Sequence, residues 1–229
     1  MAKVLIVGPH PDDAEIGMGG AILKMVARGW GVVIVDLTDG EPTPFGSRAV
    51  RKAEAAMATE VLGVSKRLQM EMPNRQLAAS MRNRIKLAEV IRTERPDMIF
   101  GPVLPDFHPD HLAASELCEG ARFHAKLTKT VIEGECHWVG KKFGYYSPHR
   151  SRYEKANLLV DVSGEWERKM AAIGCYESQL KASEGRAVSL VERVEAVGRY
   201  FGAMAGVRYA EPFTAGEFVR VSDIGLLET

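Results

Sequence analysis

The chain has 229 residues, of which 30 are basic and 30 acidic, so its formal net charge at neutral pH is zero. No overall field would therefore attract nucleic acid or an anionic membrane, and a 46% hydrophobic content without a long apolar run excludes disorder and a membrane span. These numbers predict one α/β domain over residues 1–229 with a small-molecule partner.

Strand and helix patterns alternate through the first half of the chain. Continuous aliphatic runs such as 3–7 are typical of strands that are covered on both faces. The predicted strands are 3–7, 31–38, 67–72 and 98–102, and the predicted helices are 15–28, 51–63, about 79–94 and one that begins near His108. This order predicts right-handed βαβ units in a Rossmann-like, three-layer αβα fold with a mostly parallel, doubly wound sheet.

The pattern is less regular after about residue 122, where a smaller C-terminal layer is expected. Amphipathic segments predict helices over 166–180 and 189–206. Short apolar segments predict strands at 131–138, 144–148, 157–163 and 217–221.

The cysteines and the N-terminal segment both indicate the cellular location of the protein. Cys118, Cys136 and Cys175 are odd in number and widely spaced, so they predict neither a disulfide framework nor a thiolate zinc site. The opening MAKVLIVG leads directly into proline and acidic residues, which favours a buried strand over a signal peptide. We therefore expect a cytoplasmic protein.

The first candidate for chemistry is the sequence His10-Pro11-Asp12-Asp13, at the end of the first predicted strand. Ligand sites in open α/β sheets lie at the carboxyl ends of strands. Two adjacent carboxylates repel each other near a core unless a cation or a proton compensates, and a divalent metal does so. The motif therefore predicts a metal site.

A second motif, His108-Pro109-Asp110-His111, follows another predicted strand and begins a helix. A catalytic zinc ion has three protein ligands from histidine and carboxylate, with water at an open position. His10, Asp13 and one histidine of the second motif complete such a set. The other acidic and imidazole groups are then free for proton transfer. His124 and His137 have no carboxylate at ligand spacing, and His149 could lie at a pocket rim.

The glycines at 17, 19 and 20 do not make a dinucleotide fingerprint. That motif begins directly after the strand and needs a third glycine where Ile22 stands. Close packing of the first helix explains these glycines better.

Together, the segments GPHPDDAEIGMGG, DLTDGE, HPDH and YESQ resemble the PIG-L or LmbE-like de-N-acetylases. The likeness is colinear over nearly the whole chain, and it is nearest to the bacillithiol-biosynthesis type, which hydrolyses the acetyl group of N-acetylglucosaminyl malate. The resemblance implies a Zn²⁺ ion in each subunit and a homo-oligomer such as a hexamer. A two-histidine, one-carboxylate site also accepts iron, cobalt or manganese.

The resemblance also assigns roles to residues. It implies that His10, Asp13 and His111 bind zinc and that Asp12 is the general base. His108, oriented by Asp110, is expected to stabilise the oxyanion or protonate the leaving amine. Hydrogen bonding to Asp110 is expected to favour a charged imidazolium. Arg51 is expected to bind substrate, and the alternative for Arg51 is a solvated residue in the first turn of its helix.

Some positions depart from the bacillithiol-type pattern. Asn74, Gln76 and Leu190 stand where that type has Asp, Gly and Tyr. The aglycone is therefore open, and an enzyme for another N-acetylated amino sugar fits equally well. Two alternatives from other classes are a metal-dependent phosphoesterase and a non-catalytic sugar-binding module. The first needs ligands for a second metal or a phosphate clamp, and the second has no use for Asp12.

Overall fold

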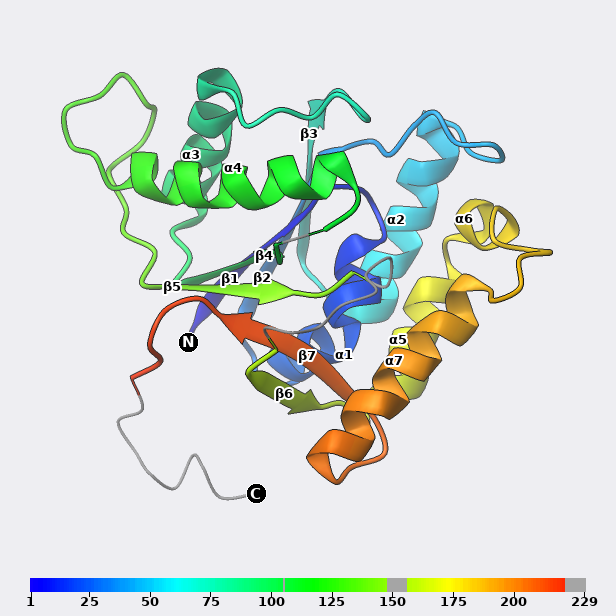
Figure 1. Ribbon diagram of the computed structural model, residues 1–229. Coiled ribbons are helices and arrows are strands. Elements are labelled where there is room, and N and C mark those ends of the chain that lie inside the picture. The colour runs from blue at the N-terminus through cyan, green and yellow to red at the C-terminus, as the bar shows by residue number, and fades with distance from the viewer. Residues whose placement is uncertain (105, 148–155, 221–229) are drawn as a thin grey trace.

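The computed structural model describes residues 1–104, 106–147 and 156–220 and forms one seven-stranded sheet with helices on both faces (Figure 1). The strands lie in the order β3-β2-β1-β4-β5-β7-β6. Their bounds are β1 Lys3–Gly8, β2 Gly31–Thr38, β3 Lys66–Met72, β4 Met98–Pro102, β5 Lys141–Tyr145, β6 Leu158–Asp161 and β7 Ala210–Ala215.

Helices α3 and α4 cover one face of the sheet, and α1 packs on the other, where α2, α5 and α7 join it (Figure 1). The helices are α1 Asp13–Ala27, α2 Arg48–Leu62, α3 Met81–Glu94, α4 Pro109–Ala125, α5 Trp166–Gly174, α6 Glu177–Lys181 and α7 Leu190–Ala205. The Rossmann-like αβα prediction is confirmed.

The strand order brings the two motif loops together. Strands β1 to β5 pair in parallel, and β7 is antiparallel to both β5 and β6. β1 lies between β2 and β4, so the chain reverses its winding direction between β1 and β4. A crevice opens at such a switch point outside the carboxyl ends of the strands. The loops that follow β1 and β4 border this crevice.

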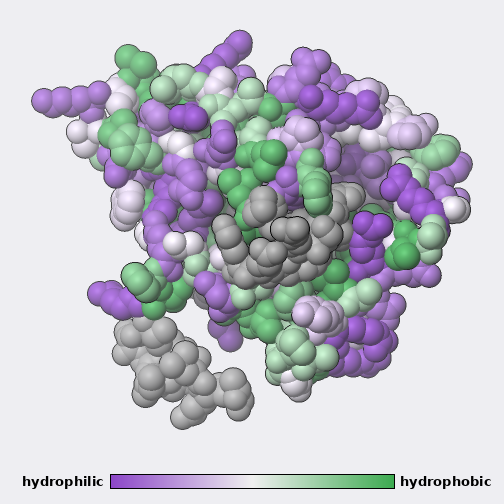
Figure 2. Space-filling view, viewed as in Figure 1, coloured by the Kyte–Doolittle hydropathy of each residue, from purple (hydrophilic) through white to green (hydrophobic). Residues whose placement is uncertain are grey.

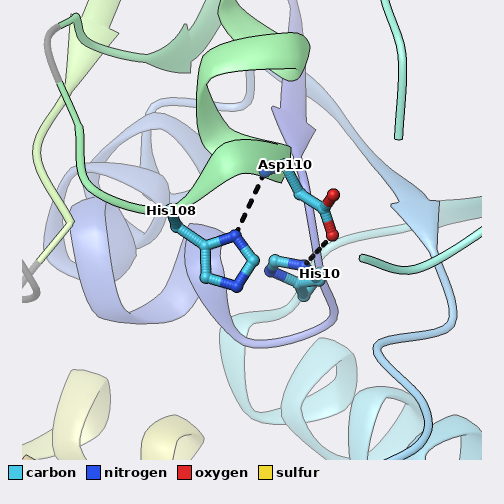
Figure 3. Close-up of side chains that lie close together, drawn as sticks. All are labelled: His10, His108 and Asp110. Atoms are coloured by element: carbon cyan, nitrogen blue, oxygen red, sulfur yellow. Dashed lines mark hydrogen bonds and ion pairs between the residues drawn. The ribbon is translucent and has the colours of Figure 1, made fainter. Parts of the chain in front are cut away.

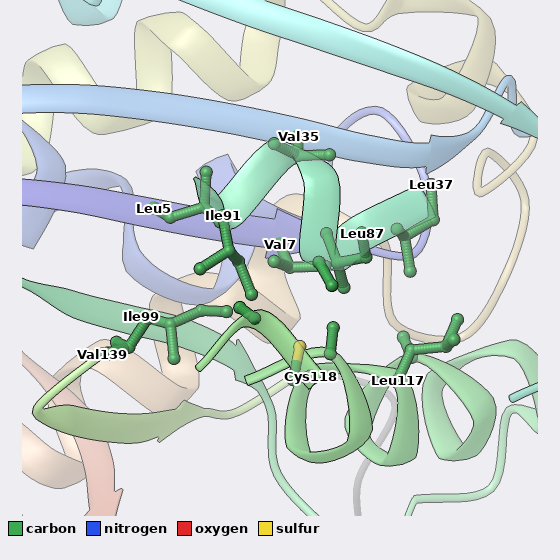
Figure 4. Packing of buried hydrophobic residues seen from close by; sticks show 14 of the residues in the cluster. Leu5, Val7, Val35, Leu37, Leu87, Ile91, Ile99, Leu117, Cys118 and Val139 are labelled. Carbon is green, nitrogen blue, oxygen red and sulfur yellow. The ribbon is translucent and has the colours of Figure 1, made fainter. Parts of the chain in front are cut away.

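Alternate residues of β1 enter two cores. Leu5 and Val7 pack with α3 and α4 (Figure 4), whereas Val4 and Ile6 face α1. Burial of such a side chain stabilises the fold by about 1.5–3 kcal/mol. β1 is thus held from both sides, and the loop after it starts from a rigid base.

Close packing explains the glycines of α1. A Cβ atom at Gly20 would lie 2.5 Å from Val162, and one at Gly17 would lie 2.4 Å from Tyr145. Any side chain at either position would push α1 away from the C-terminal layer.

Three C-terminal predictions were wrong. Residues 131–138 form no strand, because Arg92 of α3 donates hydrogen bonds to the carbonyls of Ile132 and Gly134 that a strand partner would need. The helix predicted over 166–180 breaks at Cys175 and continues as the short α6.

The last strand also lies earlier than predicted. β7 occupies Ala210–Ala215, where β5 and β6 both pair with it. The described part of the segment predicted as a strand, 217–220, is not a strand, and Val221 lies outside the described residues. Instead, the Glu217 side chain pairs with Arg122.

Figure 2 shows the face of the molecule that is turned to the viewer in Figure 1. Hydrophilic residues lie around most of its edge, and small groups of hydrophobic residues lie nearer its centre. Among the described residues, no helix combines the length and the apolar composition that a membrane crossing requires.

Candidate metal centre and active site

The loop after β1 carries three of the predicted site residues on one turn. α1 begins at Asp13, and the residue before it, Asp12, has a φ of 122°. Residues other than glycine rarely adopt a positive φ, and such strain concentrates at functional sites. His10, Asp12 and Asp13 all line one pocket.

The loop after β4 brings two histidines to the same place. α4 begins at Pro109, a residue whose fixed φ suits the first helical position, and His108 caps the helix. The ring centroid of His10 lies 4.8 Å from that of His108 and 5.4 Å from that of His111. The structure thus brings together imidazoles that are about 100 residues apart in the sequence (Figure 3).

Donor atoms of His10, Asp13 and His111 all lie within 4.8 Å of one another. Nδ1 of His10 is 3.0 Å from Asp13 Oδ2, and Nε2 of His111 is 3.4 Å from Asp13 Oδ1. Two imidazole nitrogens and a carboxylate that converge in this way can hold one divalent cation.

The second nitrogen of each of these histidines contacts another carboxylate. His10 Nε2 lies 3.1 Å from Asp110 Oδ2, and His111 Nδ1 lies 3.0 Å from Asp106 Oδ2. Metal-binding histidines usually donate their other N–H to such a partner, which fixes the ring and makes the ligand more basic. Sequence reasoning missed Asp106, although an aspartate stands five residues before His111.

A second set of donor atoms, from His10, His108 and Asp110, is equally compact. The backbone N–H groups of Arg75 and Leu77 donate to the Asp110 carboxylate, at 2.7 and 3.2 Å. Because Asp110 is already bound by these amides and by His10, it suits a supporting role better than a ligand role.

The structure corrects the predicted link between His108 and Asp110. The Asp110 carboxylate faces His10, and only its backbone N–H contacts His108, donating to Nδ1 at 3.2 Å (Figure 3). Burial and the charges of His10 and His111 lower the pKa of His108. This lowered pKa and the hydrogen bond to Nδ1 favour a neutral ring with its proton on Nε2 over the expected charged imidazolium.

Arg51 is buried, with 2% of its surface exposed, so the solvated alternative is excluded. Its guanidinium donates to the carbonyl of Pro11 and, at 3.3 Å, to Asp12 Oδ2. It also lies 5.4 Å from the ring centre of Tyr176 and lines the pocket. Its Nε atom has no hydrogen-bond partner in the described part of the chain.

The pKa values of the two adjacent carboxyl groups, Asp12 and Asp13, shift in opposite directions. Burial raises the pKa of Asp12, and although Arg51 opposes this effect, the value reaches about 6. Burial also acts on Asp13, but His111 and His10 hold its pKa well below the ordinary value. The Asp13 carboxyl therefore favours the ionised form that a metal ligand needs, while Asp12 can exchange a proton near neutral pH.

Carboxylates around His10 and His111 favour positive charge on both rings. Burial lowers the pKa of His10, yet hydrogen bonds to Asp110 and Asp13 raise it to about 9. The pKa of His111 is likewise lowered by burial but raised to about 10 by Asp13 and Asp106. The same carboxylates that favour protons here also favour a metal cation between the rings.

The pocket above these residues has a volume of about 230 Å³. Polar side chains from three other segments line it, namely Thr43, Asn74, Gln179 and Ser183. Leu190 also lines the pocket, whereas Gln76 does not. The rings of His124 and His137 contact backbone carbonyls instead, and His149 lies outside the described residues.

Glu54 positions the segment that carries Gln179. Its buried carboxylate accepts hydrogen bonds from the N–H and the hydroxyl of Ser178, both at 2.7 Å. The amide of Gln179 in turn lies 3.0 Å from that hydroxyl. α2 therefore holds α6 against the pocket.

Sequence comparisons relate the chain to several enzymes. It is 33% identical to diacetylchitobiose deacetylase of Thermococcus kodakarensis over 96% of this chain and 85% of that protein. It is 30% identical to a probable N-acetyl-alpha-D-glucosaminyl L-malate deacetylase 2 of Bacillus anthracis, over 49% of this chain and 56% of that protein. A 4-oxalmesaconate hydratase of Pseudomonas putida is 25% identical, over 77% and 74% of the two chains.

Solved structures share the fold. A conserved protein of Thermus thermophilus superposes with a TM-score of 0.88, at 37% identity over 97% of this chain and 98% of that one. An N,N'-diacetylchitobiose deacetylase of Pyrococcus horikoshii, in complex with an inhibitor, gives a TM-score of 0.80 at 28% identity, over 92% and 82% of the two chains.

The family model of PIG-L, the GlcNAc-PI de-N-acetylases, matches residues 5–121. The matched segment contains both motif loops and every donor atom of the compact His10, Asp13 and His111 set. The chain therefore belongs to the PIG-L family and is a metal-dependent N-deacetylase, a hydrolase of amide bonds.

Proposed function

We propose that this protein is a zinc-dependent deacetylase that converts an N-acetylglucosamine conjugate, such as N-acetylglucosaminyl malate, to the free amino sugar and acetate. The observation that carries the proposal is the convergence of His10, Asp13 and His111 beside the separate carboxylate of Asp12 at one end of a pocket. The names of the diacetylchitobiose and glucosaminyl malate deacetylases support an N-acetylated sugar as substrate.

His10, Asp13 and His111 fit zinc as a group, because two histidines and one carboxylate leave a coordination position open for water. A divalent cation at this position polarises a carbonyl oxygen and makes water more acidic. Iron, cobalt or manganese would fit the same donors.

Asp12 acts as the general base in this proposal. Its backbone turn directs it into the pocket, and Arg51 holds its carboxylate at 3.3 Å. With a pKa of about 6, Asp12 is largely ionised at neutral pH and can remove a proton from water. It can then return this proton toward the leaving nitrogen.

His108 acts as a hydrogen-bond donor. Its Nδ1 accepts the N–H of Asp110, so the neutral ring carries its proton on Nε2. A preorganised N–H of this kind stabilises the negative charge that develops on the acetamide oxygen. Because His108 caps α4, its ring is held in place before the substrate binds.

The experiment is a metal-dependent acetate assay. The protein is stripped with a chelator, reloaded with zinc, cobalt, manganese or ferrous iron, and incubated with N-acetylglucosaminyl malate and N,N'-diacetylchitobiose. Acetate release that needs metal and is restored by zinc supports the proposal. It also distinguishes deacetylation from hydration, the reaction named for the Pseudomonas relative. No acetate from either substrate with any metal would refute the proposal.

The phosphoesterase alternative has less support. Both compact donor sets in the described residues share His10, so they do not form two independent metal sites. The homo-oligomeric state, the cytoplasmic location and the assignment of residues 1–229 to one domain stay predictions.

A further inference from the structure

The pocket wall farthest from the metal ligands in sequence comes from the segment between α6 and the first turn of α7. Its lining residues are Ala182, Ser183, Arg186, Val188, Leu190 and Arg193. This wall lies beyond the residues that the family model matches. It is therefore a place where substrate preference can vary without change to the metal centre.

Charge is unevenly distributed around the pocket. The acidic residues that line it are Asp12 and Asp13, and both belong to the metal end. Arg186 and Arg193 line the wall formed between α6 and the first turn of α7, and no carboxylate among the described residues lines that wall beside them.

These two arginines differ from the other cations of the pocket. Arg51 is bound to Asp12, and the Arg75 side chain donates to the carbonyl of Pro42 at 2.7 Å. By contrast, neither Arg186 nor Arg193 forms an ion pair or a side-chain hydrogen bond with any residue that the structure describes.

Neighbouring acids on α7 are engaged elsewhere. Glu192 forms the capping box with Ser189, and Glu195 pairs with Arg199 at 2.9 Å. Arg193 is therefore free to turn its guanidinium into the pocket. A guanidinium fork in a concave site matches the geometry of a carboxylate or a phosphate.

We propose that Arg186 and Arg193 form an anion subsite that binds a carboxylate or phosphate on the aglycone of the substrate. The preferred substrate is then an anionic N-acetylglucosamine conjugate and not a neutral disaccharide. Val188 and Leu190, on the same wall, offer apolar surface to a short aliphatic aglycone. This inference rests on the proposed function.

The test compares kcat/KM for acetate release from three substrates: N-acetylglucosaminyl malate, N-acetylglucosamine 1-phosphate and neutral N,N'-diacetylchitobiose. The variants are R186Q, R193Q and the double variant. R199Q is the matched control, because Arg199 lies on the same helix but outside the pocket lining. Thermal melting of each variant verifies that it is folded.

We expect the double variant to lose about 10-fold or more in kcat/KM for an anionic substrate, mainly through KM, since a charged hydrogen bond is lost at each position. Activity on the neutral disaccharide should change less than about 3-fold, and R199Q should behave as the wild type. The ratio between the malate and phosphate conjugates tells which anion the subsite prefers. Equal losses on neutral and anionic substrates would overturn the proposal.

A binding measurement keeps the two proposals separable. Titration calorimetry with malate and with inorganic phosphate, on the zinc-loaded wild type and on the double variant, needs no turnover. If no substrate releases acetate but the double variant binds these anions about 10-fold more weakly than the wild type, the proposed function fails and the anion subsite stands. Equal binding by the two proteins would refute the subsite.

Discussion

The two ends of the pocket are built differently. At the end with the candidate metal site, β1 and β4 fix the motif loops, and the second nitrogens of His10 and His111 each contact a carboxylate. At another part of the wall, the segment from the end of α6 to the first turn of α7 presents Arg186 and Arg193 without side-chain partners among the described residues. In the function that we propose, the contrast teaches that the chemistry depends on mutually supported side chains, whereas substrate preference depends on side chains that can be replaced without change to the metal site.

The largest expected effect comes from removing a ligand. His111→Ala should lose most of its bound metal, and acetate release should fall by roughly 10³-fold or more, because two ligands hold a divalent ion poorly. Metal analysis by mass spectrometry and the acetate assay measure this. Full metal occupancy in the variant would show that the other donor set, with His108 and Asp110, holds the ion.

A smaller loss of activity is expected when the proposed general base, Asp12, is replaced and the proposed metal ligands are unchanged. Asp12→Asn should keep the metal and lose about 10²–10⁴-fold in kcat, the range for one general base. The same two measurements apply. Metal loss as great as that of His111→Ala would contradict the division of roles between Asp12 and the ligands.

The supporting carboxylates should matter less than the ligands. Asp106→Asn weakens the hydrogen bond to His111 Nδ1, and we expect metal affinity to fall about 10–100-fold. Competition with a chelator measures this affinity. Glu116→Gln is the matched control, since Glu116 is an exposed carboxylate on α4. If both variants bind metal equally well, Asp106 has no supporting role.

The smallest expected effect concerns the anchor of α6. Glu54→Gln replaces a charged acceptor of two hydrogen bonds from Ser178, which should cost about 1–3 kcal/mol of stability. The melting temperature should fall by roughly 2–4 °C for each kcal/mol in a chain of this size. A several-fold rise in KM should accompany it, because Gln179 lines the pocket.

Glu60→Gln tests whether the effect of Glu54 is local. Glu60 is an exposed carboxylate on the same helix α2, so its substitution should leave both melting and KM unchanged. Equal behaviour of the two variants would show that the contact with Ser178 does not position α6.

The pattern of residues predicted the parallel part of the fold well. Its strands are continuous aliphatic runs and its helices have clear periodicity, so local signals agree with the final structure. The C-terminal layer was predicted less well. Residues 131–138 have a strand-like composition, but Arg92 donates hydrogen bonds to two of their carbonyls, which a strand partner would need. A hydrogen bond between residues so far apart in the sequence cannot be predicted from the local pattern of residues.

By itself, the sequence determined the two His-Pro-Asp motifs, their positions after buried strands, and hence the convergence of His10, Asp13 and His111. Only the tertiary structure decided that Asp110 faces His10, that Asp106 supports His111, that Arg51 is buried against Asp12, and that Arg186 and Arg193 line the same pocket. The physical reason is that strand order brings loop ends together by a general rule, whereas side-chain pairing depends on distances between elements that no spacing in the chain encodes.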